Sequence, residues 1–268
     1  MEQHRTLEID GHTVHYRDEG RDNPKTVVLL HGFMQSLDVW SSYVLTYMSG
    51  YRVVTIDLPG HGQTDTFSEI HTMYFMAKVV RDVLNHIGVE RCVMVGHSLG
   101  GYVALAFADM FPYALRGLGL INSHALADSE EKRASREEIC HMVLENKAKF
   151  IVDFVPRLFA ECRREEMSQD IKYLKDQCLE TSVESICAAQ IGMARRPSRV
   201  NVLEELEVPV LLVYGKNDSR LQPELAVAHA LLPRRAEMLM LDKSGHMTFL
   251  EERDYVKARI ANFVDTCY

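Results

Sequence analysis

Short apolar runs recur along the chain and are separated by turn residues and longer amphipathic stretches. Runs at 26–32, 51–60 and 91–98 are rich in Val, Leu and Ile and are bounded by turn residues, a pattern typical of buried strands. Two further runs lie at 115–122 and 208–215. Because these runs lack regular polar alternation, they predict a parallel sheet that is covered on both faces.

Helical patterns lie between the predicted strands. Apolar residues recur at helical spacing from 79 to 87, and a second helix is expected from 102 to 111, ahead of Pro112. The chain starts with two alternating segments around a glycine, which predict an antiparallel hairpin at the sheet edge. The last part predicts, in order, a helix near 224–232, a strand near 237–241 and a helix ending near 264. Alternating strands and helices indicate an α/β fold.

The alternation stops in the middle of the chain. From 123 to 205 charged residues are interleaved with apolar ones at helical spacing, and no convincing strand occurs. We therefore expect a helical insertion over 123–205, with one core split into 1–122 and 206–268.

Composition narrows the class of protein. The chain has 268 residues, 47% of them hydrophobic, which suits one domain with an insertion, and its formal charge of -8 argues against nucleic acid as a partner. The six cysteines form no C-x-x-C pair and no Cys/His group with ligand spacing, so we expect reduced thiols, no metal and no other cofactor. Neither a signal peptide nor a membrane span is recognisable, which favours a cytoplasmic protein. The sequence leaves the oligomeric state open.

A candidate nucleophile lies at the end of the third predicted strand. The segment "GHSLG", residues 96–100, has the G-x-S-x-G pattern between a buried strand and a helix. A sharp turn at this place exposes the serine hydroxyl, and small neighbours leave room for it. The following helix also directs its N-terminal amides at charge that develops beside Ser98. The alternative is an ordinary turn with a serine helix cap, which the flanking strand and helix disfavour.

A serine nucleophile needs a base and an orienting acid. Of the twelve histidines, His246 stands out because it follows the last strand on a loop, whereas most others fall in the edge hairpin or in helices. Asp218 follows the strand at 208–215 in the same way. Loops at the carboxyl ends of parallel strands meet at one edge, so Ser98, Asp218 and His246 are predicted to meet there, in the chain order expected of a triad.

Two backbone amides are candidates for an oxyanion hole. The amide of Leu99 directly follows the nucleophile, and the amide of Phe33 lies in "HGFMQS", residues 31–36, after the first buried strand. Both would stabilise negative charge on a reacting carbonyl oxygen.

These motifs together resemble the α/β-hydrolase superfamily. The segments "HGFMQS", "DLPGHG", "GHSLGG", "GKND" and "SGH" occur in the order and spacing of that superfamily and span nearly the whole chain. The resemblance implies an eight-stranded sheet, with the insertion at 123–205 forming a helical cap over the active site. Haloalkane dehalogenases and epoxide hydrolases share part of the pattern, but they use an aspartate where this chain has Ser98.

The residues favour acyl chemistry: a serine hydrolase that cleaves a carboxylic ester or thioester of a small molecule through an acyl-enzyme on Ser98. The same triad also serves carbon–carbon bond hydrolases and the small lyases of menaquinone synthesis, which resemble this architecture and usually hold substrate carboxylates with basic side chains. A third reading is a binding protein that keeps the fold without turnover.

The pocket is harder to predict. Met34 and Met247 flank the catalytic loops, and His124 follows a strand on the active edge, so these three are candidate pocket residues. Basic residues in the insertion could hold a carboxylate, but a solvated charged face is the preferred interpretation of Arg157, Arg163, Arg164, Arg195 and Arg196.

Overall fold

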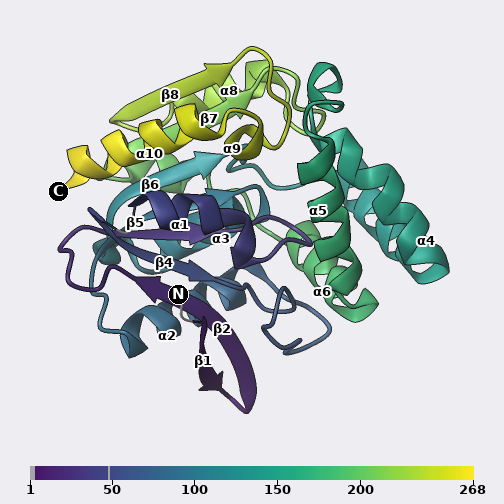
Figure 1. Ribbon diagram of the computed structural model, residues 1–268, viewed down its shortest axis with the longest axis horizontal. Helices are drawn as coiled ribbons and strands as arrows, with labels where there is room; N and C mark the ends of the chain where they lie inside the picture. The colour runs from purple at the N-terminus through teal and green to yellow at the C-terminus, as the bar shows by residue number, and fades with distance from the viewer. Residues whose placement is uncertain (1–3, 48) are drawn as a thin grey trace.

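A single eight-stranded sheet forms the centre of the molecule in the computed structural model, which describes residues 4–47 and 49–268 (Figure 1). The strand order is β1-β2-β4-β3-β5-β6-β7-β8, with β1 and β2 antiparallel to their neighbours and the other strands parallel. The strands are β1 (His4–Ile9), β2 (His12–Glu19), β3 (Thr26–Leu30), β4 (Arg52–Ile56), β5 (Cys92–His97), β6 (Leu115–Ile121), β7 (Val210–Gly215) and β8 (Ala236–Leu241). The α/β architecture and the edge hairpin agree with the prediction.

Both faces of the sheet are covered by helices. Val28 and Leu30 of β3 pack in one hydrophobic cluster with α2 (Met73–His86) and α3 (Leu99–Met110). Val27 and Leu29 pack in a second cluster with α1 (Ser41–Tyr47) and α10 (Arg253–Cys267). Successive strand residues point to opposite faces, so burial on both sides explains the continuous apolar runs. The remaining core helices are α8 (Pro223–Ala230) and α9 (Thr248–Glu251).

The register of the sheet brings the strand ends into line. Leu30 of β3 pairs with Gly96 of β5, Gly96 pairs with Leu120 of β6, and Leu120 pairs with Leu212 of β7. The loops that follow these strands therefore leave the sheet at one edge, where parallel sheets carry their sites.

A layer of helices lies beyond that edge. It contains α4 (Glu130–Phe154), α5 (Ser168–Glu180) and α6 (Val183–Ala194), grouped at the end toward which the arrows of β6 and β8 point (Figure 1). The last helix of the inserted segment, α7 (Val200–Glu205), instead packs against α3 of the core. Within the described ranges, no helix is both long and apolar enough to cross a membrane.

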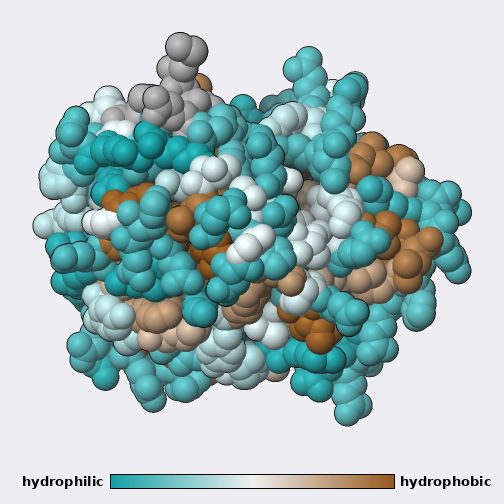
Figure 2. Space-filling model, turned by 90° about the horizontal axis from the view of Figure 1, so that it is seen from below, coloured by the Kyte–Doolittle hydropathy of each residue, from teal (hydrophilic) through white to brown (hydrophobic). Residues whose placement is uncertain are grey.

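The surface of the helical layer carries several apolar side chains. Figure 2 shows hydrophobic residues on the side where this layer lies and a second group on the other half of the molecule, within a largely hydrophilic surface. Met142, Leu144 and Val152 of α4 are exposed. Their exposure reflects the weak amphipathic pattern of this helix, which also contains a break in helical geometry at Asn146.

Candidate active site

Ser98 lies in a strained turn between β5 and α3. Its backbone has φ 51° and ψ -112°, and its amide donates a hydrogen bond to the carbonyl oxygen of Ile121 at 2.9 Å. A Cβ atom on Gly96 would lie 2.2 Å from the carbonyl oxygen of Gly100, and one on Gly100 would lie 2.4 Å from that of Leu30. Only glycine fits at these two positions, so the elbow depends on the spacing of the motif. Backbone strain of this kind costs about 1–3 kcal/mol and is concentrated at functional sites.

Three side chains form a continuous line of hydrogen bonds. His246 Nε2 lies 2.9 Å from Ser98 Oγ, and His246 Nδ1 lies 2.8 Å from Asp218 Oδ2. Because Nδ1 donates to the carboxylate, the neutral ring has Nε2 free to accept the serine proton. The structure thus brings together the three residues that the sequence singled out. Asp218 follows β7, and His246 follows β8.

Asp218 is held in its ionised form. Its Oδ2 atom accepts a hydrogen bond from Asn122 Nδ2 at 2.9 Å, and its Oδ1 atom accepts one from the Arg220 amide at 2.7 Å. Burial opposes ionisation, but His246 and these donors lower the pKa of Asp218 below its usual value. The carboxylate therefore keeps its negative charge at neutral pH and orients the imidazole.

Asn122 is a site residue that sequence reasoning missed. Besides Asp218, its Nδ2 atom contacts the carbonyl oxygen of Gly245 at 3.1 Å, and its Oδ1 atom accepts from Thr248 Oγ1 at 2.6 Å. Asn122 has φ 47°, a conformation that asparagine adopts more readily than most residues. It ties the acid to the loop that carries His246. A polar residue directly after β6, on the active edge, is the only sequence signal that could have indicated it.

A buried histidine, His97, holds the loop of His246 in place. Burial, together with the nearby His246 ring, lowers the pKa of His97 to about 3, so its ring is neutral. Its Nε2–H donates to the carbonyl oxygen of His246 at 2.9 Å. The side chain that adjoins Ser98 in sequence therefore points into the core and steadies the His246 loop.

The segment 31–36 follows β3 and comes near Ser98. Phe33 and Ser98 line the same cavity. In the described part of the chain, neither the Phe33 amide nor the Leu99 amide has a hydrogen-bond acceptor. Gln35 braces the segment, because its Oε1 atom accepts from the Gly32 amide at 2.9 Å. Two such amides beside a candidate nucleophile are the arrangement that an oxyanion requires.

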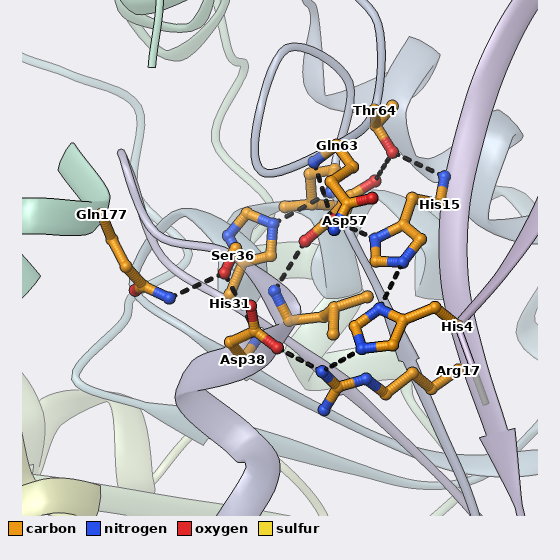
Figure 3. Close-up of polar contacts among 12 residues, drawn as sticks. His4, His15, Arg17, His31, Ser36, Asp38, Asp57, Gln63, Thr64 and Gln177 are labelled. Atoms are coloured by element: carbon orange, nitrogen blue, oxygen red, sulfur yellow. Dashed lines mark hydrogen bonds and ion pairs between the residues drawn. The ribbon is translucent and has the colours of Figure 1, made fainter. Parts of the chain in front are cut away.

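A polar network around Asp57 fixes this segment from behind (Figure 3). The Asp57 carboxylate accepts hydrogen bonds from the Leu37 amide at 2.6 Å, the Gln63 amide at 3.0 Å and His15 Nδ1 at 2.6 Å. Burial alone would raise the pKa of Asp57, but these donors, led by His15, lower it. His15 Nε2 contacts His4 at 2.7 Å, so the network reaches the edge hairpin. The motif "DLPGHG" thereby holds loops in place and contributes no group to the cavity lining.

A cavity of about 150 Å³ lies above Ser98 and His246. His124, one of the three predicted pocket residues, lines it. Met34 and Met247 do not; both are 0% exposed and pack in the hydrophobic cluster of α1 and α10. Their side chains leave the catalytic loops on the core side, so adjacency in sequence did not give access to the cavity.

The cavity is also more basic than the sequence suggested. Its lining includes Lys132 and Arg136 of α4, and Arg220 from the loop that carries the acid. None of these was among the arginines considered for the pocket. Of those, Arg196 is buried behind the wall, where it pairs with Asp128 at 2.7 Å, and Arg163 pairs with Glu252 at 2.9 Å.

Comparison with known proteins gives a consistent picture of the fold. A family model described as alpha/beta hydrolase fold matches residues 25–137. A thermophilic esterase from Thermogutta terrifontis, solved with malate bound, superposes with a TM-score of 0.92 at 27% identity, covering 99% of each chain. A 2-hydroxy-6-oxononadienedioate/2-hydroxy-6-oxononatrienedioate hydrolase from Paraburkholderia phymatum is 27% identical over 94% of this chain and 90% of its own length. MenH from S. aureus shares the fold, with a TM-score of 0.83 at 22% identity, covering 94% of this chain and 97% of its own.

Proposed function

We propose that this chain, which belongs to the α/β-hydrolase superfamily, is a serine hydrolase that cleaves a carboxylic ester or thioester of a small molecule. The observation that carries the proposal is the unbroken hydrogen-bond line from Asp218 through His246 to Ser98, which ends at a cavity. The similarity to a solved esterase over nearly the whole chain supports it.

The first half-reaction forms an acyl-enzyme. Ser98 Oγ attacks the substrate carbonyl carbon while His246 Nε2 accepts the serine proton. The carbonyl π electrons move to oxygen, where the Phe33 and Leu99 amides donate to the resulting oxyanion. When the carbonyl re-forms, the bond to the leaving group breaks, and His246 gives its proton to the departing alcohol or thiol.

The second half-reaction releases the acid. Water attacks the acyl carbon, His246 accepts one water proton, and the collapse of the second oxyanion returns that proton to Ser98 Oγ. Asp218 keeps its charge throughout and stabilises the imidazolium that forms in each half. Each oxyanion donor contributes about 2.7–4 kcal/mol in comparable enzymes, so the two amides supply a large share of the rate enhancement.

A fluorophosphonate probe and a panel of p-nitrophenyl esters test the proposal. The probe should label the wild-type protein but not Ser98→Ala, and ester hydrolysis should fall to the residual rate that the oxyanion hole and binding alone supply. Esters of increasing chain length would also show how large an acyl group the cavity admits. Folded wild-type protein that neither reacts with the probe nor turns over any ester would instead support a non-catalytic binding protein.

Cleavage of a carbon–carbon bond is the second candidate. The observation in its favour is the 27% identity, over most of both chains, to the Paraburkholderia phymatum hydrolase, whose name denotes a dienedioate substrate. A direct comparison would offer the protein neutral aryl esters and acidic dienone substrates. Turnover of the esters with none of the dienones would exclude this candidate, and the reverse would exclude the first.

A further inference from the structure

Positive charge exceeds negative charge around the cavity. Asp128 is the acidic residue of the lining, and its buried carboxylate is shared by two guanidinium groups, those of Arg136 and Arg196. Lys132 and Arg220 add two more cations to the wall. Three cationic side chains and one carboxylate therefore line the cavity, with Arg196 behind the wall, while Asp218 is already engaged by His246.

Two of these cations lack an acidic partner. In the part of the chain that the structure describes, no carboxylate lies within 4.0 Å of the Arg220 guanidinium or the Lys132 ammonium. The Arg220 guanidinium carbon lies 4.7 Å from the centroid of the Phe154 ring. A guanidinium placed over an aromatic ring is attracted to that ring and still has N–H donors available for a planar anion.

A hydroxyl donor is available beside these cations. His124 Nδ1 accepts a hydrogen bond from the Leu126 amide at 3.2 Å, and burial is the main cause of a pKa of His124 well below its usual value. The neutral ring therefore carries its proton on Nε2, which lies 3.1 Å from the hydroxyl oxygen of Tyr102. Tyr102 accepts that bond, so its own proton remains free to donate into the cavity that it lines.

We propose that the substrate of the hydrolase proposed above carries a carboxylate, which Arg220 binds through its guanidinium and Tyr102 through its hydroxyl. Lys132 adds charge at the mouth of the cavity. The substrate class is then a short acid ester, for example the monoester of a dicarboxylic acid, with the carbonyl at Ser98 and the free carboxylate at Arg220. An uncharged ester of the same length would leave the guanidinium without its partner.

A matched pair of esters tests this proposal: mono-p-nitrophenyl glutarate and its methyl ester, methyl p-nitrophenyl glutarate. The wild-type kcat/KM should be roughly tenfold or more higher for the acid, since a hydrogen bond to a charged group contributes about 1.5–3 kcal/mol. Arg220→Met should remove most of this preference through KM, and Tyr102→Phe should remove part of it. Lys149→Met is the control, because Lys149 is an exposed cation of α4, the helix that carries Lys132, and does not line the cavity. Its preference should equal that of wild type.

Equal turnover of the two esters by wild type, or an undiminished preference in Arg220→Met, would overturn the proposal and leave the serine hydrolase intact. If neither ester is hydrolysed, the proposed function fails, and calorimetric titration of the wild-type protein with glutarate and with the neutral glutaramide decides the inference separately. Binding of glutarate alone, lost in Arg220→Met, would support it. Binding of neither compound, or glutarate binding that survives Arg220→Met, would refute it.

Discussion

Replacement of Asn122 tests whether one buried amide connects the acid to the base. The side chain makes three hydrogen bonds, one of them to the ionised Asp218, and Asn122 is 2% exposed. A bond to a charged group contributes about 1.5–3 kcal/mol and a neutral bond about 0.5–1.5 kcal/mol. Loss of all three in Asn122→Gly should therefore lower the free energy of unfolding by roughly 3–5 kcal/mol.

A second substitution at the same position separates the backbone from the side chain. Asn122→Ala loses the same hydrogen bonds, but it must also hold φ near 47°, which an alanine does at a cost of about 1–2 kcal/mol. Because alanine has less entropy than glycine in the unfolded chain, the net difference should be about 1 kcal/mol, with alanine the less stable.

Urea unfolding of the three proteins measures both quantities from the midpoints, provided that the slopes agree. The aryl-ester hydrolysis proposed for Ser98 should fall up to roughly 100-fold in both variants at a temperature where they remain folded, since small misplacement of a catalytic group has effects of this size. A glycine variant within about 0.5 kcal/mol of wild type would refute the hydrogen-bond argument. An alanine variant as stable as the glycine variant would refute the backbone argument.

Three further substitutions examine other parts of the site. Gly100→Ala should lower the free energy of unfolding by about 3 kcal/mol or more and remove most activity, because the added Cβ would lie 2.4 Å from a backbone oxygen. Gly50→Ala is the control: no atom lies within 4 Å of its added carbon, so its stability should be nearly that of wild type. Asp57→Asn replaces a carboxylate that accepts three hydrogen bonds, so it should lower the free energy of unfolding by about 3 kcal/mol and slow the proposed acylation. An unchanged urea midpoint would contradict this expectation. For Asp128, the donors Arg196 and Arg136 outweigh burial and lower the pKa from 3.8 to about 2, so its stabilising effect is present above pH 3.8 and is lost as the pH falls through about 2. The difference in unfolding free energy between wild type and Asp128→Asn should accordingly shrink by about 2 kcal/mol from pH 6 to pH 2, and an unchanged difference would count against the pairing.

The fold and the hydrogen-bonded line of Ser98, His246 and Asp218 could be predicted because both follow from local rules. A buried strand, a glycine turn and a helix are all encoded within a few residues of Ser98, and parallel topology then brings the loops after β7 and β8 to the same edge. Each of the three residues lies within five positions of a strand end. The burial of histidines followed no such rule. His229, one of the histidines predicted to lie in a helix, is 2% exposed and accepts a hydrogen bond from the Ala125 amide.

The chemistry of the cavity wall depends on how α4 packs, and the sequence contains little information about that. Residues 130–138 are mostly charged, so no apolar stripe distinguishes an inner face from an outer one. Lys132 and Arg136 are one helical turn apart and reach the cavity, while the neighbouring Arg133 lies outside its lining. Arg136 contacts Asp128 and Gln190, and these contacts set its position at the cavity. The pattern of one helix alone does not reveal such contacts. The residues proposed to carry out the reaction could therefore be found from local motifs, whereas those proposed to select the substrate become apparent only when the inserted helices are packed onto the sheet.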